Sequence, residues 1–214
     1  MTNNSLADAH VTSPQHKFYW LPNALTIVRI ALIPILIAGI LSLHFGWNTQ
    51  FGGAWVLAGV YIFAVATDFF DGFLARRWNV VSDFGRMIDP IADKLLVAGC
   101  LIAFMIASQG AWVFMVPALA IIGRDILVSG AREHAALAGR VMPPTNLAKW
   151  KTACEMLAIA ALLVWVLGKA YLAIDTAIPS IWGAAKTLGL VLLWLAAVLS
   201  VYTGSLYFRA ALKS

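Results

Sequence analysis

The chain consists of long apolar stretches separated by short polar connections. A membrane-spanning helix needs about 20 predominantly apolar residues, and six stretches meet that length. The pattern predicts these helices at residues 24–45, 53–76, 87–108, 112–134, 147–168 and 183–207. We therefore expect an all-α fold: a polytopic membrane protein built as a six-transmembrane-helix bundle.

The N-terminal segment differs from the rest of the chain. Residues 1–13 are polar, and His16 to Leu21 (HKFYWL) mixes basic and aromatic side chains, as segments lying along a membrane surface do. We expect Pro22 and Asn23 to break the chain before the first spanning helix. The chain then divides into a polar, interfacial segment, residues 1–21, and a membrane domain, residues 22–214.

Composition and charge support this reading. Of the 214 residues, 62% are hydrophobic and 12% are charged, whereas soluble domains carry about 25% charged residues. The net charge of +5 does not indicate a nucleic-acid partner, because the basic residues lie mostly in short connections between apolar stretches. The connections 46–52 and 109–111 carry none of them. The positive-inside rule therefore places both termini and the acidic residues 68–93 on the cytoplasmic side of a multi-pass protein. We expect the membrane to be a bacterial-type inner membrane.

Acidic residues are concentrated where two predicted helices meet the cytoplasm. Five of the chain's ten acids lie between Asp68 and Asp93. Asp68 and Asp71, three apart, share one face of the second helix, and Asp89 and Asp93, four apart, share one face of the third. Residues 77–86 are expected to reverse the chain, so that the four carboxylates converge.

Four converging carboxylates would repel one another unless cations neutralised them. Their hard oxygen atoms, with no His or Cys nearby, favour Mg²⁺ or Mn²⁺. Two such ions would neutralise the cluster and keep open coordination positions. Paired metals suit in-line displacement at phosphorus, since they clamp the attacking and leaving oxygens.

The residues beside the acids suit a phosphate-containing ligand. Gly72 lets a ligand approach the helix backbone closely, and the small side chain of Ala75 leaves room on the same face of the helix. Arg76 offers a planar fork of donors to phosphate oxygens. Gly85 is expected to relieve the turn or to leave room beside Asp89.

Together these residues form the pattern Asp68-x-x-Asp71-Gly72-x-x-Ala75-Arg76, then Gly85-x-x-x-Asp89-x-x-x-Asp93. The pattern resembles the complete signature of the CDP-alcohol phosphatidyltransferase family. The resemblance implies a six-helix membrane enzyme, a homodimer, that exchanges CMP on a CDP-linked lipid for an incoming alcohol.

The same resemblance implies roles for individual residues. Asp68, Asp71 and Asp89 would bind metal, and Asp93 would bind metal or act as the catalytic base. The expected CDP-binding residues are Asp68, Asp71, Gly72, Ala75, Arg76 and Gly85.

The resemblance extends to the phosphatidylglycerolphosphate synthase branch of the family. It is carried by Pro22–Arg29, Asp68–Asn79, Asp89–Lys94, Arg124–Ile126, Arg132–Glu133 and Lys149–Thr152. That branch transfers a phosphatidyl group from CDP-diacylglycerol to glycerol 3-phosphate, an anionic acceptor. We expect the acceptor phosphate to be bound by four basic residues, namely Arg124, Arg132, Lys149 and Lys151.

Several polar residues in the apolar stretches have two interpretations. Arg29 either extends to the lipid headgroups or lines the active-site cavity with Asn23 and Thr26. Asp125 and Glu155 are either partners for Arg124 or Arg132, or supports of helix packing.

Two charged residues lie beside the motif. Lys94 either pairs locally, or extends to the headgroups, or contacts substrate. Asp83 is expected to be a solvated charge in the loop.

Other functions are compatible with parts of the pattern. Inositol phosphate, serine or phosphatidylglycerol could replace glycerol 3-phosphate as the acceptor. A cation or proton transporter also needs intramembrane acids, but it would place them near the bilayer midplane. Here the acids are concentrated at one edge, which favours the transferase.

Overall fold

The computed structural model describes residues 21–46, 51–78, 83–137, 139, 146–172 and 179–212. Within these ranges, side chains are described at 23–46, 53, 55–67, 70, 85, 87–137, 139, 147–169 and 181–209. The described residues form six helices, which are α1 (Leu21–Phe45), α2 (Phe51–Trp78), α3 (Asp83–Ala107), α4 (Trp112–Leu137), α5 (Asn146–Leu172) and α6 (Pro179–Leu212).

The helices have the length and composition of a polytopic membrane protein. In the described residues, α1, α3, α4, α5 and α6 are each long and apolar enough to cross a bilayer, whereas the apolar stretch of α2 is shorter, Trp55–Thr67. Large apolar side chains such as Ile62 and Val198 are exposed on the bundle, as expected where lipid is the solvent. The predicted all-α membrane fold is confirmed.

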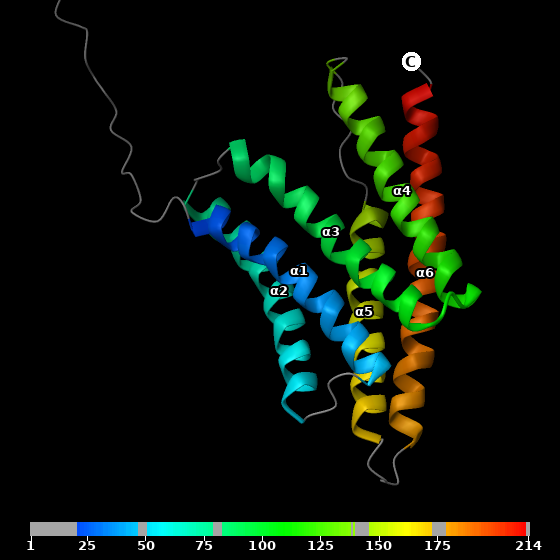
Figure 1. Ribbon diagram of the computed structural model, residues 1–214. Coiled ribbons are helices and arrows are strands. Elements are labelled where there is room, and N and C mark those ends of the chain that lie inside the picture. The colour runs from blue at the N-terminus through cyan, green and yellow to red at the C-terminus, as the bar shows by residue number, and fades with distance from the viewer. Residues whose placement is uncertain are drawn as a thin grey trace, which may run out of the picture.

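The helices pack as neighbours in an antiparallel bundle (Figure 1). α5 and α6 lie side by side, α4 packs on α6, and α1 contacts both α2 and α3. One end of the bundle carries the starts of α1, α3 and α5 and the ends of α2, α4 and α6. The core between the helices is apolar and includes Leu36, Phe104, Ile159 and Leu193.

Close approaches at two glycines bring the helices together. A Cβ atom at Gly99 of α3 would lie 2.9 Å from Ile33 Cγ2 of α1. A Cβ atom at Gly189 of α6 would lie 2.8 Å from Leu162 Cγ of α5. Small residues at helix contacts allow this close packing in membranes.

The start of α1 differs from the prediction. The helix begins at Leu21, so Pro22 and Asn23 lie in its first turn and do not break the chain before it. Proline is tolerated there because the first amide groups of a helix have no partner within the helix. Residues 1–20, most of the predicted interfacial segment, lie outside the described residues.

The connection between α2 and α3 is shorter than the predicted 77–86. Only residues 79–82 separate the two helices, because α2 continues to Trp78 and α3 begins at Asp83. Asp83 is therefore the first residue of a helix, and the prediction that it lies in the connecting loop is wrong. Gly85 lies in the first turn of α3 and is buried, so it does not relieve a turn.

Candidate active site

A cavity of about 800 Å³ is formed by side chains of α2, α3, α4 and α5. This volume is in the range of about 300–1,000 Å³ that is usual for ligand pockets. Apolar side chains form part of its wall, including Val65, Leu96 and Met156. Its charged lining residues are Asp93, Lys94, Arg124, Asp125, Arg132, Lys149, Lys151 and Glu155.

The four basic residues predicted from the sequence all line this one cavity. Arg124 and Arg132 come from α4, and Lys149 and Lys151 come from the first turns of α5. Lys151 is buried, with 3% of the residue exposed, whereas Lys149 is exposed. With Lys94, five basic residues face three acids among the described lining residues, so the cavity favours an anionic ligand.

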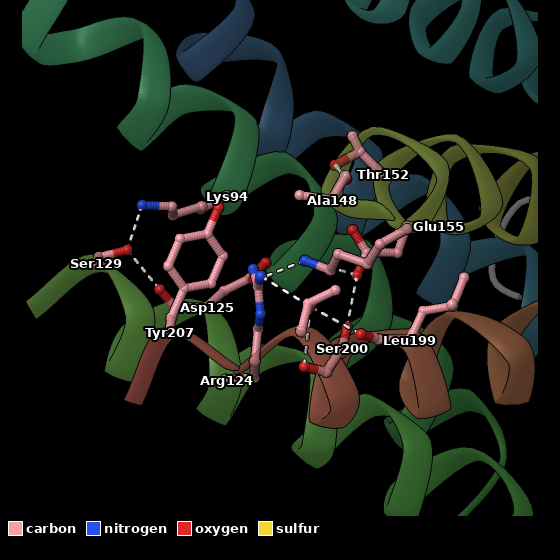
Figure 2. A network of polar contacts seen from close by, with 12 residues as sticks. Lys94, Arg124, Asp125, Ser129, Ala148, Thr152, Glu155, Leu199, Ser200 and Tyr207 are labelled. Atoms are coloured by element: carbon pink, nitrogen blue, oxygen red, sulfur yellow. Dashed lines mark hydrogen bonds and ion pairs between the residues drawn. The ribbon is translucent and has the colours of Figure 1, made fainter. Parts of the chain in front are cut away.

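Asp125 holds two of these cations together (Figure 2). One carboxylate oxygen, Asp125 Oδ1, accepts from Arg124 NH1 at 2.9 Å and from Lys151 Nζ at 2.5 Å. Because the three groups are largely buried, their charges need partners within the protein. The interpretation of Asp125 as a partner of Arg124 is confirmed.

Glu155 is a second acid in the same network. It lies one helical turn beyond Lys151, and its Oε1 is 2.9 Å from Lys151 Nζ. Only 2% of Glu155 is exposed, and Ser200 Oγ lies 3.5 Å from Oε1. Lys151 is thus clamped between two carboxylates, which orients its ammonium group at the cavity wall.

Helix α6 supports the arginines from behind the cavity. Arg124 NH2 donates to Thr203 Oγ1 at 3.0 Å. Arg132 NH2 donates to the hydroxyl of Tyr207 at 2.7 Å, and the guanidinium carbon lies 4.7 Å from the centre of the same ring. The Arg124 side chain passes directly over Gly204, where a Cβ atom would be 2.8 Å from Arg124 Cγ.

Sequence reasoning missed this role of α6. A signal for it exists: Ser200, Thr203, Gly204 and Tyr207 recur at spacings of three and four in an otherwise apolar helix. Such spacing puts small and polar side chains on one face. That face is the one that contacts α4 and α5.

Lys94 has a local partner. Its ammonium group donates to Ser129 Oγ, and Ser129 in turn donates to the carbonyl oxygen of Asp125. Lys94 also lines the cavity. Both local pairing and access to a bound ligand are therefore present.

The acids of α3 are held by α1. Asp93 lines the cavity with 42% of its side chain exposed, and its Oδ1 is 2.9 Å from Arg29 NH1. Asp89 Oδ1 accepts from Thr26 Oγ1 at 2.6 Å. The side chain of Arg29 is fully buried, so the interpretation that it extends to the lipid headgroups is wrong. Asn23, the third predicted cavity residue, is half-buried in the same helix.

The remaining motif residues belong to α2. The backbone places Asp68, Asp71, Gly72, Ala75 and Arg76 in the last turns of that helix, but their side chains lie outside the described residues. Among the described side chains, no group of three His, Cys, Asp or Glu residues could hold a metal ion. Asp89 and Asp93 supply hard oxygen donors that fit Mg²⁺ or Mn²⁺. A complete site would need the α2 carboxylates as well.

Comparison with known proteins identifies the family. Residues 19–202 match the family model described as CDP-alcohol phosphatidyltransferase. The chain belongs to the CDP-alcohol phosphatidyltransferase family and is a multi-pass membrane transferase.

Curated relatives cover nearly the whole chain. The CDP-diacylglycerol–glycerol-3-phosphate 3-phosphatidyltransferase of Rickettsia bellii is 40% identical over 90% of this chain and 96% of its own length. The protein of the same name from Cereibacter sphaeroides is 35% identical over 90% of this chain and 95% of its own. A cardiolipin synthase (CMP-forming) of Oryza sativa is 34% identical over 97% of this chain and 62% of its own.

Proposed function

We propose that this chain transfers the phosphatidyl group of CDP-diacylglycerol to glycerol 3-phosphate, releasing CMP and forming phosphatidylglycerol phosphate. The bacterial relatives are named for this reaction, and their similarity covers 90% of this chain. The observation that carries the proposal is the cavity that joins Asp93 of the motif to the four predicted phosphate-binding residues.

Two groups of cavity residues have different roles, namely binding of the acceptor phosphate and activation of the acceptor hydroxyl. Arg124, Arg132, Lys149 and Lys151 bind the phosphate of the acceptor, with arginine forks fixing its orientation. The acceptor's primary hydroxyl then faces Asp93 at the α3 side of the cavity. This division fits phosphoryl transfer, which depends mainly on positioning and charge neutralisation.

The chemical step is a displacement at the lipid-bearing phosphorus. Asp93 accepts the proton of the acceptor hydroxyl as the hydroxyl oxygen attacks. A new oxygen–phosphorus bond forms, and the bond between that phosphorus and the phosphate oxygen of CMP breaks. CMP leaves with the electron pair of that bond.

Divalent cations complete the proposed site. Asp68, Asp71, Asp89 and Asp93 would hold two Mg²⁺ or Mn²⁺ ions, which neutralise the charge of the diphosphate when bound. Gly72, Ala75, Arg76 and Gly85 would border the CDP group, as the family motif implies.

The membrane setting follows the charge pattern. The active site lies at the bundle end that carries the basic connections, which we assign to the cytoplasmic face of a bacterial-type inner membrane. The acyl chains of the substrate stay in lipid beside α2. We further assign a homodimer by family analogy.

The acceptor is tested with purified protein in detergent. CDP-diacylglycerol and Mg²⁺ are supplied with glycerol 3-phosphate, inositol phosphate, serine or phosphatidylglycerol, and CMP release and product mass are measured. We expect glycerol 3-phosphate to give the highest turnover and a product with the mass of phosphatidylglycerol phosphate.

Phosphatidylglycerol is the most informative competitor, because one relative is a cardiolipin synthase. Preferential use of phosphatidylglycerol would contradict the proposed acceptor, and preferential use of zwitterionic serine would contradict the role given to the basic cavity. CMP release that is absent with every acceptor would reject the reaction itself.

A methyl group at Gly204 should weaken acceptor binding. In Gly204→Ala the new Cβ would lie 2.8 Å from Arg124 Cγ, so the arginine must move. Because a 1 Å misplacement can cost about 100-fold in activity, we expect the KM for glycerol 3-phosphate to rise roughly tenfold. Steady-state kinetics with varied acceptor measures this.

The matched control for Gly204 lies on the same helix. A Cβ at Gly183 would meet no atom within 4 Å, so Gly183→Ala should leave the KM unchanged. Equal KM values in the two variants would show that the contact between Gly204 and Arg124 does not set acceptor affinity.

A further inference from the structure

Helix α1 carries two buried polar residues inside an apolar span. Thr26 is 1% exposed and Arg29 is 0% exposed, although the span Asn23–Phe45 is among the most apolar in the chain. Burying a guanidinium in such surroundings costs several kcal/mol unless it is paired. A residue of this kind needs a reason beyond packing.

The two residues contact the two motif acids of α3 in register. Thr26 Oγ1 donates to Asp89 Oδ1 at 2.6 Å, and Arg29 NH1 donates to Asp93 Oδ1 at 2.9 Å. Thr26 and Arg29 are three apart and the acids are four apart, so successive turns of α1 match successive turns of α3. Both helices start at the same end of the bundle.

The contact between the two helices is tightly packed. Further along, the backbone of α3 at Gly99 approaches α1 so closely that a Cβ atom would lie 2.9 Å from Ile33 Cγ2 and 3.1 Å from Ile37 Cδ1. Tightly packed interiors hold side chains in single rotamers. We therefore expect the packing of α1 against α3 to fix the positions of the Thr26 and Arg29 donor groups.

Neither donor is among the described residues that line the acceptor cavity. Among the described residues, the cavity wall contains Asp93 but not Thr26 or Arg29. Their hydrogen bonds to Asp89 and Asp93 allow them to act on a ligand of those acids without lining the cavity.

Charge compensation alone does not explain the pair. Arg29 could serve only to neutralise Asp93, but Thr26 is uncharged and compensates no charge. Both residues instead donate a directed hydrogen bond to one oxygen of a motif carboxylate. Partners of this kind orient metal-binding carboxylates, and their loss usually costs about 10–100-fold in metal affinity or activity.

We propose that Thr26 and Arg29 are positioning residues that preset the carboxylates of Asp89 and Asp93 to receive a divalent cation. The inference rests on the proposed function and goes beyond it, because it states that side chains of α1 fix the orientation of the carboxylates on α3. It implies that the affinity for the cation depends on the Thr26 hydroxyl.

Threonine 26 gives the cleanest test, because its replacements are uncharged. Mn²⁺ binding is titrated by electron paramagnetic resonance with no substrate present, in wild type, Thr26→Val and Thr26→Ser. Valine keeps the shape and lacks the hydroxyl. We expect Thr26→Val to weaken Mn²⁺ binding about 10–100-fold, and Thr26→Ser to stay near wild type.

Two further measurements separate positioning from a structural effect. The melting temperature of each variant is recorded, and the KM for glycerol 3-phosphate should be unchanged in Thr26→Val while its kcat at limiting Mn²⁺ falls. Ser42→Ala is the matched control, because the Ser42 hydroxyl bonds the Gly39 carbonyl in the same helix at 3.0 Å. Its Mn²⁺ affinity should equal that of wild type.

The outcomes distinguish this inference from the function on which it rests. Wild-type Mn²⁺ affinity in Thr26→Val, or a serine variant as weak as the valine variant, overturns the positioning role while the transferase proposal stands. Wild-type protein that binds no Mn²⁺ and releases no CMP overturns both.

Discussion

Asp93→Asn is expected to reduce CMP release about 10²–10⁴-fold, the usual contribution of a general base. Asp93 is the motif acid with 42% of its side chain exposed at the cavity wall. The amide of asparagine cannot accept the hydroxyl proton and is a poorer ligand for a divalent cation. Initial rates with saturating CDP-diacylglycerol and glycerol 3-phosphate measure the loss.

Two comparisons make the Asp93 result specific. Asp175→Asn removes one carboxylate in the segment between α5 and α6 and should retain the wild-type rate. The melting temperature of Asp93→Asn shows whether the bundle is intact. A folded Asp93→Asn protein with more than a tenth of the wild-type rate would contradict the role of Asp93 in the chemical step.

Lys151→Met is expected to cause the largest loss of stability, about 3–5 kcal/mol in the free energy of unfolding. The ammonium of Lys151 lies 2.5 Å from Asp125 Oδ1 and 2.9 Å from Glu155 Oε1. Without it, two neighbouring buried carboxylates lose their shared cation. Thermal unfolding in detergent and the KM for glycerol 3-phosphate should both be affected.

A second substitution separates the two effects of Lys151. The double variant Lys151→Met/Glu155→Gln also removes one of the two carboxylates that lose their partner. We therefore expect its melting temperature to lie between those of Lys151→Met and the wild type, while acceptor binding stays weak. Lys149→Met is the matched control for stability, because Lys149 is exposed and such substitutions usually change stability by less than about 0.5 kcal/mol. A Lys151→Met protein as stable as Lys149→Met would contradict the buried network.

The sequence predicts the fold well, because membrane helices are specified by local composition. All six helices were predicted, and errors were confined to their ends. The α2–α3 connection is a clear case: Asn79, Ser82 and Gly85 suggested a long turn, yet α3 begins at Asp83. Residue types that are common in turns also occur in the first turn of helices, so composition alone does not show where a helix starts.

The basic residues of the cavity were predicted from the sequence, but the residues of α6 that support them were not. Arg124, Arg132, Lys149 and Lys151 stand out because charge is rare in apolar helices. Thr203, Gly204 and Tyr207 do not stand out, because each residue type is common in membrane helices. Their role depends on which face of α6 meets α4, and that is set by packing between distant segments.

Helix α1 illustrates the same limit. The sequence marked Arg29 as a charged residue in a membrane span and gave Thr26 as a candidate cavity residue beside it. It could not assign them to Asp89 and Asp93, which lie 63 and 64 positions away along the chain. Pairing across helices depends on register, and register follows from the packing of small residues such as Gly99 against Ile33.

The central claim is that the carboxylates at the end of α2 and the start of α3 share divalent cations beside the basic cavity. Electron paramagnetic resonance of the purified protein titrated with Mn²⁺ tests it most directly, because ions about 4 Å apart are magnetically coupled. We predict two coupled Mn²⁺ ions per chain, with coupling lost in both Asp71→Asn and Asp89→Asn. A single uncoupled ion, or coupling that survives in either variant, would contradict the shared site.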